Sequence, residues 1–111
     1  MTRFVHPRLD DVSLSAVLHA LADPMRRRIL STLSKDKACD GKGLACSAAA
    51  PPEIPKATLS HHFSVLRAAG LVRAEKRGVE VIHVIRCDEV DRRFPGVLAA
   101  ILAAEDTADA A

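Results

Sequence analysis

The clearest pattern of apolar and polar positions lies at residues 56–70. Leu59, Phe63 and Leu66 recur at helical spacing and form one apolar stripe. Small polar side chains fall off that stripe, and Gly70 follows the last apolar turn, where helices commonly end in a left-handed residue. The pattern predicts a short helix that buries one face and presents a polar face to a partner.

The same spacing predicts two helices within residues 12–33. In the first, the apolar side chains fall mostly on one broad face. Asp23 suits a helix N-cap and Pro24 suits the first helical position, so the second helix should begin there. Residues 1–10 are polar and interrupted by a proline, and we expect them to form an irregular arm.

Residues 34–55 are the least regular part of the chain. Residues 34–40 are charged and loop-like, whereas residues 41–50 can form a short helix despite two glycines. Three prolines within residues 51–55 then break the chain. We expect a helix-turn-helix over residues 41–70, with a supporting helix and a turn longer than the tightest version.

A β-hairpin is predicted over residues 71–86. Residues 71–75 form the first strand, and residues 76–78 form the turn, in which a glycine can adopt a positive φ. Residues 79–86 are rich in β-branched side chains, which is typical of a returning strand. A hairpin with cations at its tip, directly after a helix with a polar face, is typical of a wing.

The last predicted helix, over residues 95–104, is apolar on nearly every side and follows a polar turn that starts at Asp88. Such a helix cannot be exposed in a soluble monomer, so it must pack on another surface. One explanation is a second copy related by a twofold axis, with the first helix in the same interface. The other is that the last helix folds back on its own domain. Residues 105–111 would follow as a flexible acidic tail. The predicted interface residues are Leu14, Val17, Leu18, Val97, Leu98, Ile101 and Leu102.

The amino-acid composition bounds the number of domains, the compartment and the kind of nucleic acid that the protein could bind. The chain has 111 residues, 49% of them hydrophobic and 27% charged, which favours one compact domain and argues against disorder. Three cysteines, without a signal-peptide pattern or a run of transmembrane length, indicate a cytoplasmic protein with reduced thiols. An aromatic content of only 3% disfavours single-strand binding by base stacking.

Charge is distributed unevenly, although the net charge is only +2. Residues 56–86 carry six Lys or Arg against two Glu, whereas residues 87–111 carry two Arg against six acids. The polar helix and the hairpin can therefore face phosphate, although ordinary surface scatter can give a similar count. Arg26, Arg27 and Arg28 also stand in sequence on the second helix, where at least one should point outward near a bound backbone.

Two segments resemble the ArsR/SmtB family of bacterial repressors. Leu21-Ala-Asp-Pro-Met-Arg-Arg-Arg-Ile-Leu30 is similar to the opening of that family's second helix. Thr58-Leu-Ser-His-His-Phe-Ser-Val-Leu-Arg-Ala-Ala-Gly-Leu-Val72 is similar to its recognition helix and exit, and the Arg77-Gly78 turn falls where the family has its wing. Together these segments cover about residues 12–104.

The resemblance implies a mainly α fold with a small β-hairpin wing, in which five helices build a winged helix-turn-helix and the hairpin lies between the fourth and fifth. It further implies a homodimer that binds double-stranded DNA with twofold symmetry, usually as a repressor, and that would associate with the nucleoid in this way. A winged-helix module for protein interaction, whose apolar last helix meets another partner, is the alternative. The cations clustered on the helix and the hairpin favour DNA.

The N-terminal residues of a recognition helix reach the base edges in helix-turn-helix proteins. Hydroxyl groups are permissive readers, so we expect phosphate contacts to supply much of the affinity and to make it salt-dependent. His61 should contact DNA and His62 should pack against the supporting helix; neither suits a metal, because adjacent helical residues point about 100° apart. The plainer interpretation of the hairpin cations is a charged tip that keeps the sheet edge soluble. The predicted DNA-binding residues are Lys56, Thr58, Ser60, His61, Ser64, Arg67, Lys76 and Arg77.

The cysteines raise the question of a sensor, because the resemblance implies that a metal, a metalloid or thiol oxidation can release the DNA. The family's Cys-x-Cys is absent, since Cys39 and Cys46 are seven positions apart, and the last helix carries no His for an interfacial zinc site. Two thiols could hold As(III), Cu(I) or Zn(II), with a third ligand from Cys87 or the other subunit, or they could form a disulfide. The plainer interpretation is a buried Cys46 and an incidental Cys39.

An enzyme is not expected from this sequence. We find no Ser-His-Asp, Cys-His or paired-carboxylate set at a useful spacing, and no glycine-rich loop that could cradle a phosphate. The sequence also names neither an operator nor an inducer.

Overall fold

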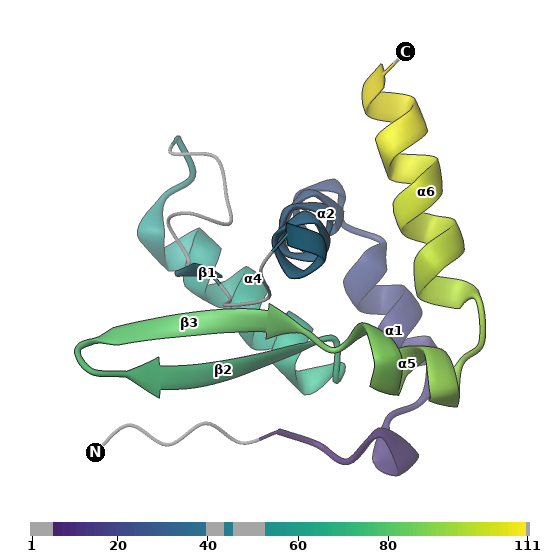
Figure 1. Cartoon of the computed structure of the whole chain (residues 1–111), viewed down its shortest axis with the longest axis horizontal. Coiled ribbons are helices and arrows are strands. Elements are labelled where there is room, and N and C mark those ends of the chain that lie inside the picture. The colour runs from purple at the N-terminus through teal and green to yellow at the C-terminus, as the bar shows by residue number, and fades with distance from the viewer. Residues whose placement is uncertain (1–5, 40–43, 46–52, 111) are drawn as a thin grey trace.

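A computed structural model describes the fold over residues 6–39, 44–45 and 53–110 (Figure 1). Helices dominate, and a long hairpin extends from them on the side away from the last helix (Figure 1). The elements in chain order are the 3-10 helix η1 (Leu9–Asp11), α1 (Leu14–Leu21), α2 (Pro24–Cys39), β1 (Leu44–Ala45), α4 (Lys56–Ala68), β2 (Val72–Arg77), β3 (Glu80–Ile85), α5 (Cys87–Arg93) and α6 (Val97–Ala110).

The junction between α1 and α2 follows from local capping. Asp23 Oδ1 accepts hydrogen bonds from the backbone N–H groups of Met25 at 2.8 Å and Arg26 at 3.2 Å, and Pro24 is the first helical residue. These bonds confirm Asp23 as the N-cap. The loop predicted over residues 34–40 is wrong up to Cys39, because α2 continues to that residue.

A three-stranded antiparallel sheet has the order β1-β3-β2. Leu44 and Ala45 pair with His83 and Ile82 of β3, so the helix predicted over residues 41–50 is wrong at these two positions, and its other residues lie outside the described ones. A strand is favoured here because it pairs the backbone groups on the outer side of β3.

The strands of the hairpin differ from their predicted bounds. The first covers residues 72–77 where 71–75 were predicted, and the return strand covers residues 80–85 where 79–86 were predicted. Pairing runs from Val72 opposite Ile85 to Arg77 opposite Glu80, so both Lys76 and Arg77 belong to the strand instead of the turn. Gly78 adopts a φ of 61° at the turn, the positive φ that the pattern required there.

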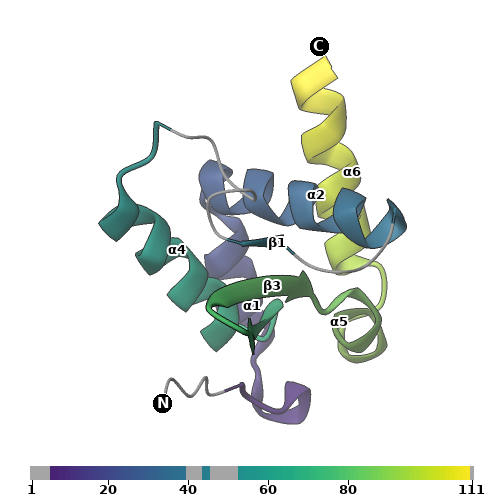
Figure 2. The ribbon, with the colours of Figure 1, turned by 60° about the vertical axis from the view of Figure 1, so that its left-hand side comes forward.

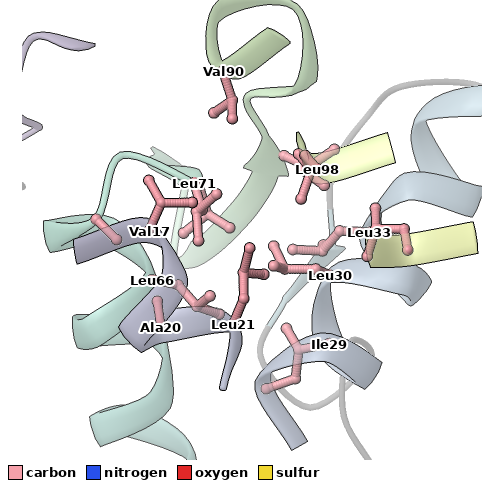
Figure 3. Close-up of a cluster of buried hydrophobic side chains, with 14 of the residues drawn as sticks. Val17, Ala20, Leu21, Ile29, Leu30, Leu33, Leu66, Leu71, Val90 and Leu98 are labelled. Carbon is pink, nitrogen blue, oxygen red and sulfur yellow. The ribbon is translucent and has the colours of Figure 1, made fainter. Parts of the chain in front are cut away.

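The core lies between α1, α2, α4 and the root of the hairpin (Figure 3). The apolar stripe of α4 is buried as predicted, with Leu66 fully enclosed and Phe63 at 1% exposure. Gly70, with a φ of 76°, ends the helix, and a Cβ at this position would lie 3.2 Å from a methyl carbon of Val12.

The C-terminal part differs most from the sequence prediction. The polar turn expected at Asp88 is wrong, because residues Cys87–Arg93 form α5, which is anchored by the fully buried Val90. The flexible tail expected over residues 105–111 is also wrong up to Ala110, since α6 continues to that residue, and residue 111 lies outside the described ones. Figure 2 shows α6 standing against α2, and two side chains of the expected tail, Glu105 and Asp106, bond to that helix.

The arm before α1 is held against the root of the hairpin. His6 Nε2 accepts a hydrogen bond from the backbone N–H of Ala74 in β2 at 3.0 Å. The buried Arg86 donates to the carbonyl oxygen of Pro7 at 3.2 Å and also binds Glu89 at 2.7 Å. Within the part of the chain that the structure describes, no helix is long and apolar enough to cross a bilayer.

Candidate nucleic-acid interface

The polar face of α4 is exposed over the whole helix. The N-cap residue Pro55 supplies no side-chain cap, so the first N–H groups of α4 are left for an anionic partner. The cation of Lys56 stands at this same end. Arg67, in the last turn, is partly buried. The exposed predicted DNA-binding residues of α4 are Lys56, Thr58, Ser60, His61 and Ser64.

The hairpin contributes two exposed cations, Lys76 and Arg77. Arg77 Nη2 lies 3.2 Å from Glu75 Oε2, and both side chains are about half exposed to solvent. An ion pair in water stabilises little, so the guanidinium can exchange this carboxylate for a phosphate. Glu75 and Arg77 are two residues apart on β2 and so share one face of that strand, a pairing that was not predicted.

The N-terminal end of α4 and the turn of the hairpin lie on the same side of the molecule. In Figure 1 both are on the left, away from α6, and Figure 2 again places α4 and α6 on opposite sides. The exposed hydroxyl groups and cation at the start of α4 and the exposed hairpin cations therefore belong to the same side of the molecule, where positive charge predominates.

Two buried histidines support α4 from behind. His62 is 8% exposed, and its Nδ1 lies 3.4 Å from Nη1 of Arg26 in α2, so it packs inward on the first helices. His83 of β3 is 1% exposed and stacks on Phe63 with ring centroids 4.1 Å apart. Burial, with a smaller contribution from the positive charge of Arg67, lowers the pKa of His83 to about 4. The inward position of His62 was expected, but the contact that the structure gives it is to Arg26 of α2 and not to the supporting helix predicted over residues 41–50. The place of His83 depends on strand pairing and was missed.

The cysteines are only partly described. Cys39 ends α2, and Cys87 begins α5 as a half-buried thiol that forms no disulfide with another described residue. The side chain of Cys39 and all of Cys46 lie outside the described residues. Over the described residues, no cluster of three or more His, Cys, Asp or Glu side chains could hold a metal ion.

The predicted dimer residues divide into two groups. Leu14 and Leu18 on α1 are 44% and 47% exposed. Leu18 also lines a groove of 390 Å³ between α1 and α6, together with further apolar side chains and with Arg27 and Glu105. The prediction of direct contact with a partner subunit is wrong for those residues that pack in the core of their own chain. These buried residues are Val17, Leu98 and Leu102, whereas Val97 and Ile101 are partly buried.

The fold agrees with comparisons to known proteins. A family model described as a helix-turn-helix domain matches residues 21–75. An HTH-type transcriptional regulator of Methanocaldococcus jannaschii is 32% identical over 67% of this chain and 79% of its own length. The HTH-type transcriptional regulator YceK of Bacillus subtilis is 33% identical over 80% of this chain and 86% of its own length.

Two further comparisons specify the family. A transcriptional repressor SmtB homologue of Synechocystis is 31% identical over 64% of this chain and 50% of its own length. The structure of an ArsR-like transcriptional regulator from Rhodococcus sp. RHA1 superposes with a TM-score of 0.60 at 26% identity, over 87% of this chain and 86% of that one. These relatives are regulators and not enzymes. The chain therefore belongs to the ArsR/SmtB family of winged helix-turn-helix, DNA-binding transcriptional regulators.

Proposed function

We propose that the protein is a homodimeric repressor that holds a palindromic DNA operator between two copies of α4 and two hairpins. The observation that carries this proposal is that the N-terminal end of α4 and the turn of the hairpin lie on the same side of the molecule (Figure 1), the one with exposed polar side chains and the other with exposed cations beside it. A helix whose N-terminal turn is exposed fits the major groove, and a cationic hairpin beside it fits the adjacent backbone.

The chemistry of the surface favours backbone contacts over base readout. Lys56, Lys76 and Arg77 provide positive charge, while Thr58 and Ser60 offer hydroxyl groups that pair with several bases. Specificity then comes from two moderate half-site contacts held at a fixed spacing, which is why the proposal includes a twofold dimer and a palindrome.

The dimer surface proposed is the face formed by α1 and α6. Leu14 and Leu18 are large apolar side chains with nearly half of their surface exposed, and Leu18 lines a largely apolar groove. A second copy that inserts its own Leu18 into this groove would cover both surfaces by the same contact, as a twofold axis requires.

Gel retardation tests the DNA-binding part of the proposal. Lys56→Ala, Thr58→Ala and Arg77→Ala together should abolish the retardation of a duplex selected by the parent protein from random sequences. Lys35→Ala removes a cation of similar exposure that pairs with Asp106 on α6, and it should leave retardation unchanged. A folded dimeric triple variant with the affinity of the parent would favour a protein-interaction module instead.

The proposed inducer acts through Cys39 and Cys46, with Cys87 as a further ligand, either by thiol oxidation or by a soft ion. The chemistry of three thiols in a reducing compartment supports this part, and Cys39 ends the helix that packs against α6. DNA-bound protein is titrated with oxidant, As(III), Cu(I) or Zn(II). Cys39→Ser and Cys46→Ser should block release, and release equal to that of the parent would eliminate these thiols as the sensor.

A further inference from the structure

The adjacent arginines Arg26 and Arg27 both bind the C-terminal end of α1. Arg26 donates from Nε to the carbonyl oxygen of Ala20 at 2.7 Å and from Nη2 to that of His19 at 3.3 Å. Arg27 donates from Nη1 to the carbonyl oxygen of Leu21 at 2.8 Å. These carbonyl groups lie in the last turn and carry the partial negative charge of the helix end. That of His19 also accepts from the backbone N–H of Ala22 at 3.3 Å. Two cations therefore fix this end of α1.

The same two guanidinium groups then reach different helices. Arg26 Nη1 lies 3.4 Å from Nδ1 of His62 on α4. Arg27 Nε lies 2.9 Å from Oε2 of Glu105 on α6. Figures 1 and 2 both place α1 between α4 and α6. The C-terminal end of α1 and the two α2 arginines bound to it thus connect α4, the helix proposed to face DNA, with α6, a helix of the proposed dimer surface.

These hydrogen bonds and the ion pair are largely buried, so losing one of them would be costly. Arg26 and His62 are each 8% exposed, and the side chain of Glu105 is 12% exposed. A buried donor without an acceptor is costly, so the guanidinium of Arg26 depends on the carbonyl groups and on His62. Arginine has five donors and no acceptor, so Nδ1 of His62 must accept, and the proton of the neutral ring lies on Nε2.

We propose that Arg26 and Arg27 are positioning residues for DNA binding, which connect α6 to α4 through the end of α1. Arg26 positions the recognition helix α4 through its hydrogen bond to His62. Arg27 links the same end of α1 to α6 through its ion pair with Glu105. The inference rests on the proposed function, because it takes α4 as the DNA contact and α6 as part of the dimer. A lysine cannot replace either residue, since a single ammonium lacks the planar fork that spans two helices.

The first test needs no DNA. In the ¹⁵N-labelled parent protein, long-range ¹H–¹⁵N NMR spectra should show the Nδ1 of His62 without a proton and the Nε2 with one. Arg26→Gln should change this tautomer or make the ring exchange between tautomers. A proton on Nδ1 in the parent protein would overturn the Arg26–His62 link, whatever the protein binds.

The second test separates positioning from simple packing. In His62→Asn the Oδ1 atom stands where Nδ1 stood and can accept from Arg26, so affinity for the selected duplex should stay within about twofold of the parent. His62→Leu keeps the volume but removes the acceptor, and binding should weaken about tenfold. Circular dichroism and thermal melting confirm that both variants are folded. A folded His62→Leu variant with parental affinity would overturn the inference while leaving DNA binding itself in place.

The third test addresses the α6 side of the junction. Glu105→Gln should weaken duplex binding about threefold at concentrations where sedimentation shows a dimer, although Glu105 is not on α4. Combined with His62→Leu, the effect should fall short of the product of the two single effects, because both act through one junction. Multiplicative effects would overturn the connection to α6. If the parent protein retards no duplex, the proposed function fails, and the NMR result alone decides the Arg26–His62 link.

Discussion

Acid should destabilise the fold through His83, the buried histidine behind the recognition helix. Its exposure is 1%, and Phe63 stacks on it. Burial and then the positive charge of Arg67 lower its pKa from 6.5 to about 4. The unfolded chain therefore takes up a proton below pH 6.5 that the folded chain refuses. The stabilisation is complete above pH 6.5 and is lost progressively as the pH falls toward 4.

The size of the effect follows from the two pKa values. A lowering from 6.5 to about 4 corresponds to about 3 kcal/mol of unfolding free energy, at about 1.4 kcal/mol for each pH unit. Near pH 5, about 2 kcal/mol of this is lost. His6 adds a loss of the same sign, because burial and then the charge of Arg86 lower its pKa as well. Such a loss is a large fraction of the stability of a typical domain, about 5–15 kcal/mol.

Urea unfolding followed by circular dichroism measures this loss at about pH 7 and about pH 5. His83→Leu replaces the ring with an apolar side chain and should lose about 2 kcal/mol less than the parent over this interval. His61→Leu, at an exposed position on α4, is the matched control and should keep the parental pH dependence. An equal loss in the parent and in His83→Leu would refute the assignment to His83.

Three further predictions concern the helix end, the hairpin and the dimer. Gly70→Ala should cost about 1–2 kcal/mol in urea unfolding because of its positive φ, plus the cost of the close approach to Val12. Gly78→Ala has a positive φ but open space around the new methyl group, so an equal cost in both would show that the Val12 contact is unimportant. Lys76→Ala should reduce the slope of log affinity against log salt by about one, and an unchanged slope would remove Lys76 from the DNA contact. Leu18→Asp should raise the dimer dissociation constant at least about tenfold in sedimentation without lowering the unfolding free energy, and a parental constant would place the dimer contact elsewhere.

Features that depend on neighbouring residues were predictable from the sequence. The stripe of Leu59, Phe63 and Leu66, the cap at Asp23 and the break at Gly70 all act within one helix or at its end. Their physical causes, side-chain periodicity and backbone capping, operate over a few residues. The exposed polar face of α4 followed from the same periodicity.

Features that depend on distant contacts were not predictable in this way. The end of α2 and the end of α6 stabilise each other through Asp106, which accepts a hydrogen bond from Ser31 at 2.6 Å and pairs with Lys35 at 3.8 Å. Either segment alone is short, polar and weakly helical in pattern, so each was predicted to be irregular. The stacking of His83 on Phe63 likewise requires the position of β3 beside α4, and the contact of Arg26 with His62 requires α2 to pack on α4. No local sequence pattern encodes either arrangement.

The apolar pattern of α6 had a related ambiguity. Periodicity shows that Leu98 and Leu102 must be covered, but it does not say whether the same chain or a second copy covers them. The structure assigns them to the core of their own chain, whereas Leu14 and Leu18 remain exposed. The folded-back interpretation therefore holds for Leu98 and Leu102, and the dimer contact that we propose falls to the exposed Leu14 and Leu18.

The arm before α1, which His6 and Pro7 hold against the hairpin, also affects solubility. β2 lies at the edge of the sheet order β1-β3-β2, so its outward N–H groups are open to a strand from another molecule. His6 occupies one of them, the N–H of Ala74, and the bond from Arg86 to Pro7 keeps the arm alongside. A fusion or cleavage that displaced this arm would expose a strand edge while leaving the core intact. The consequence would be chain-to-chain strand pairing and precipitation of otherwise folded protein.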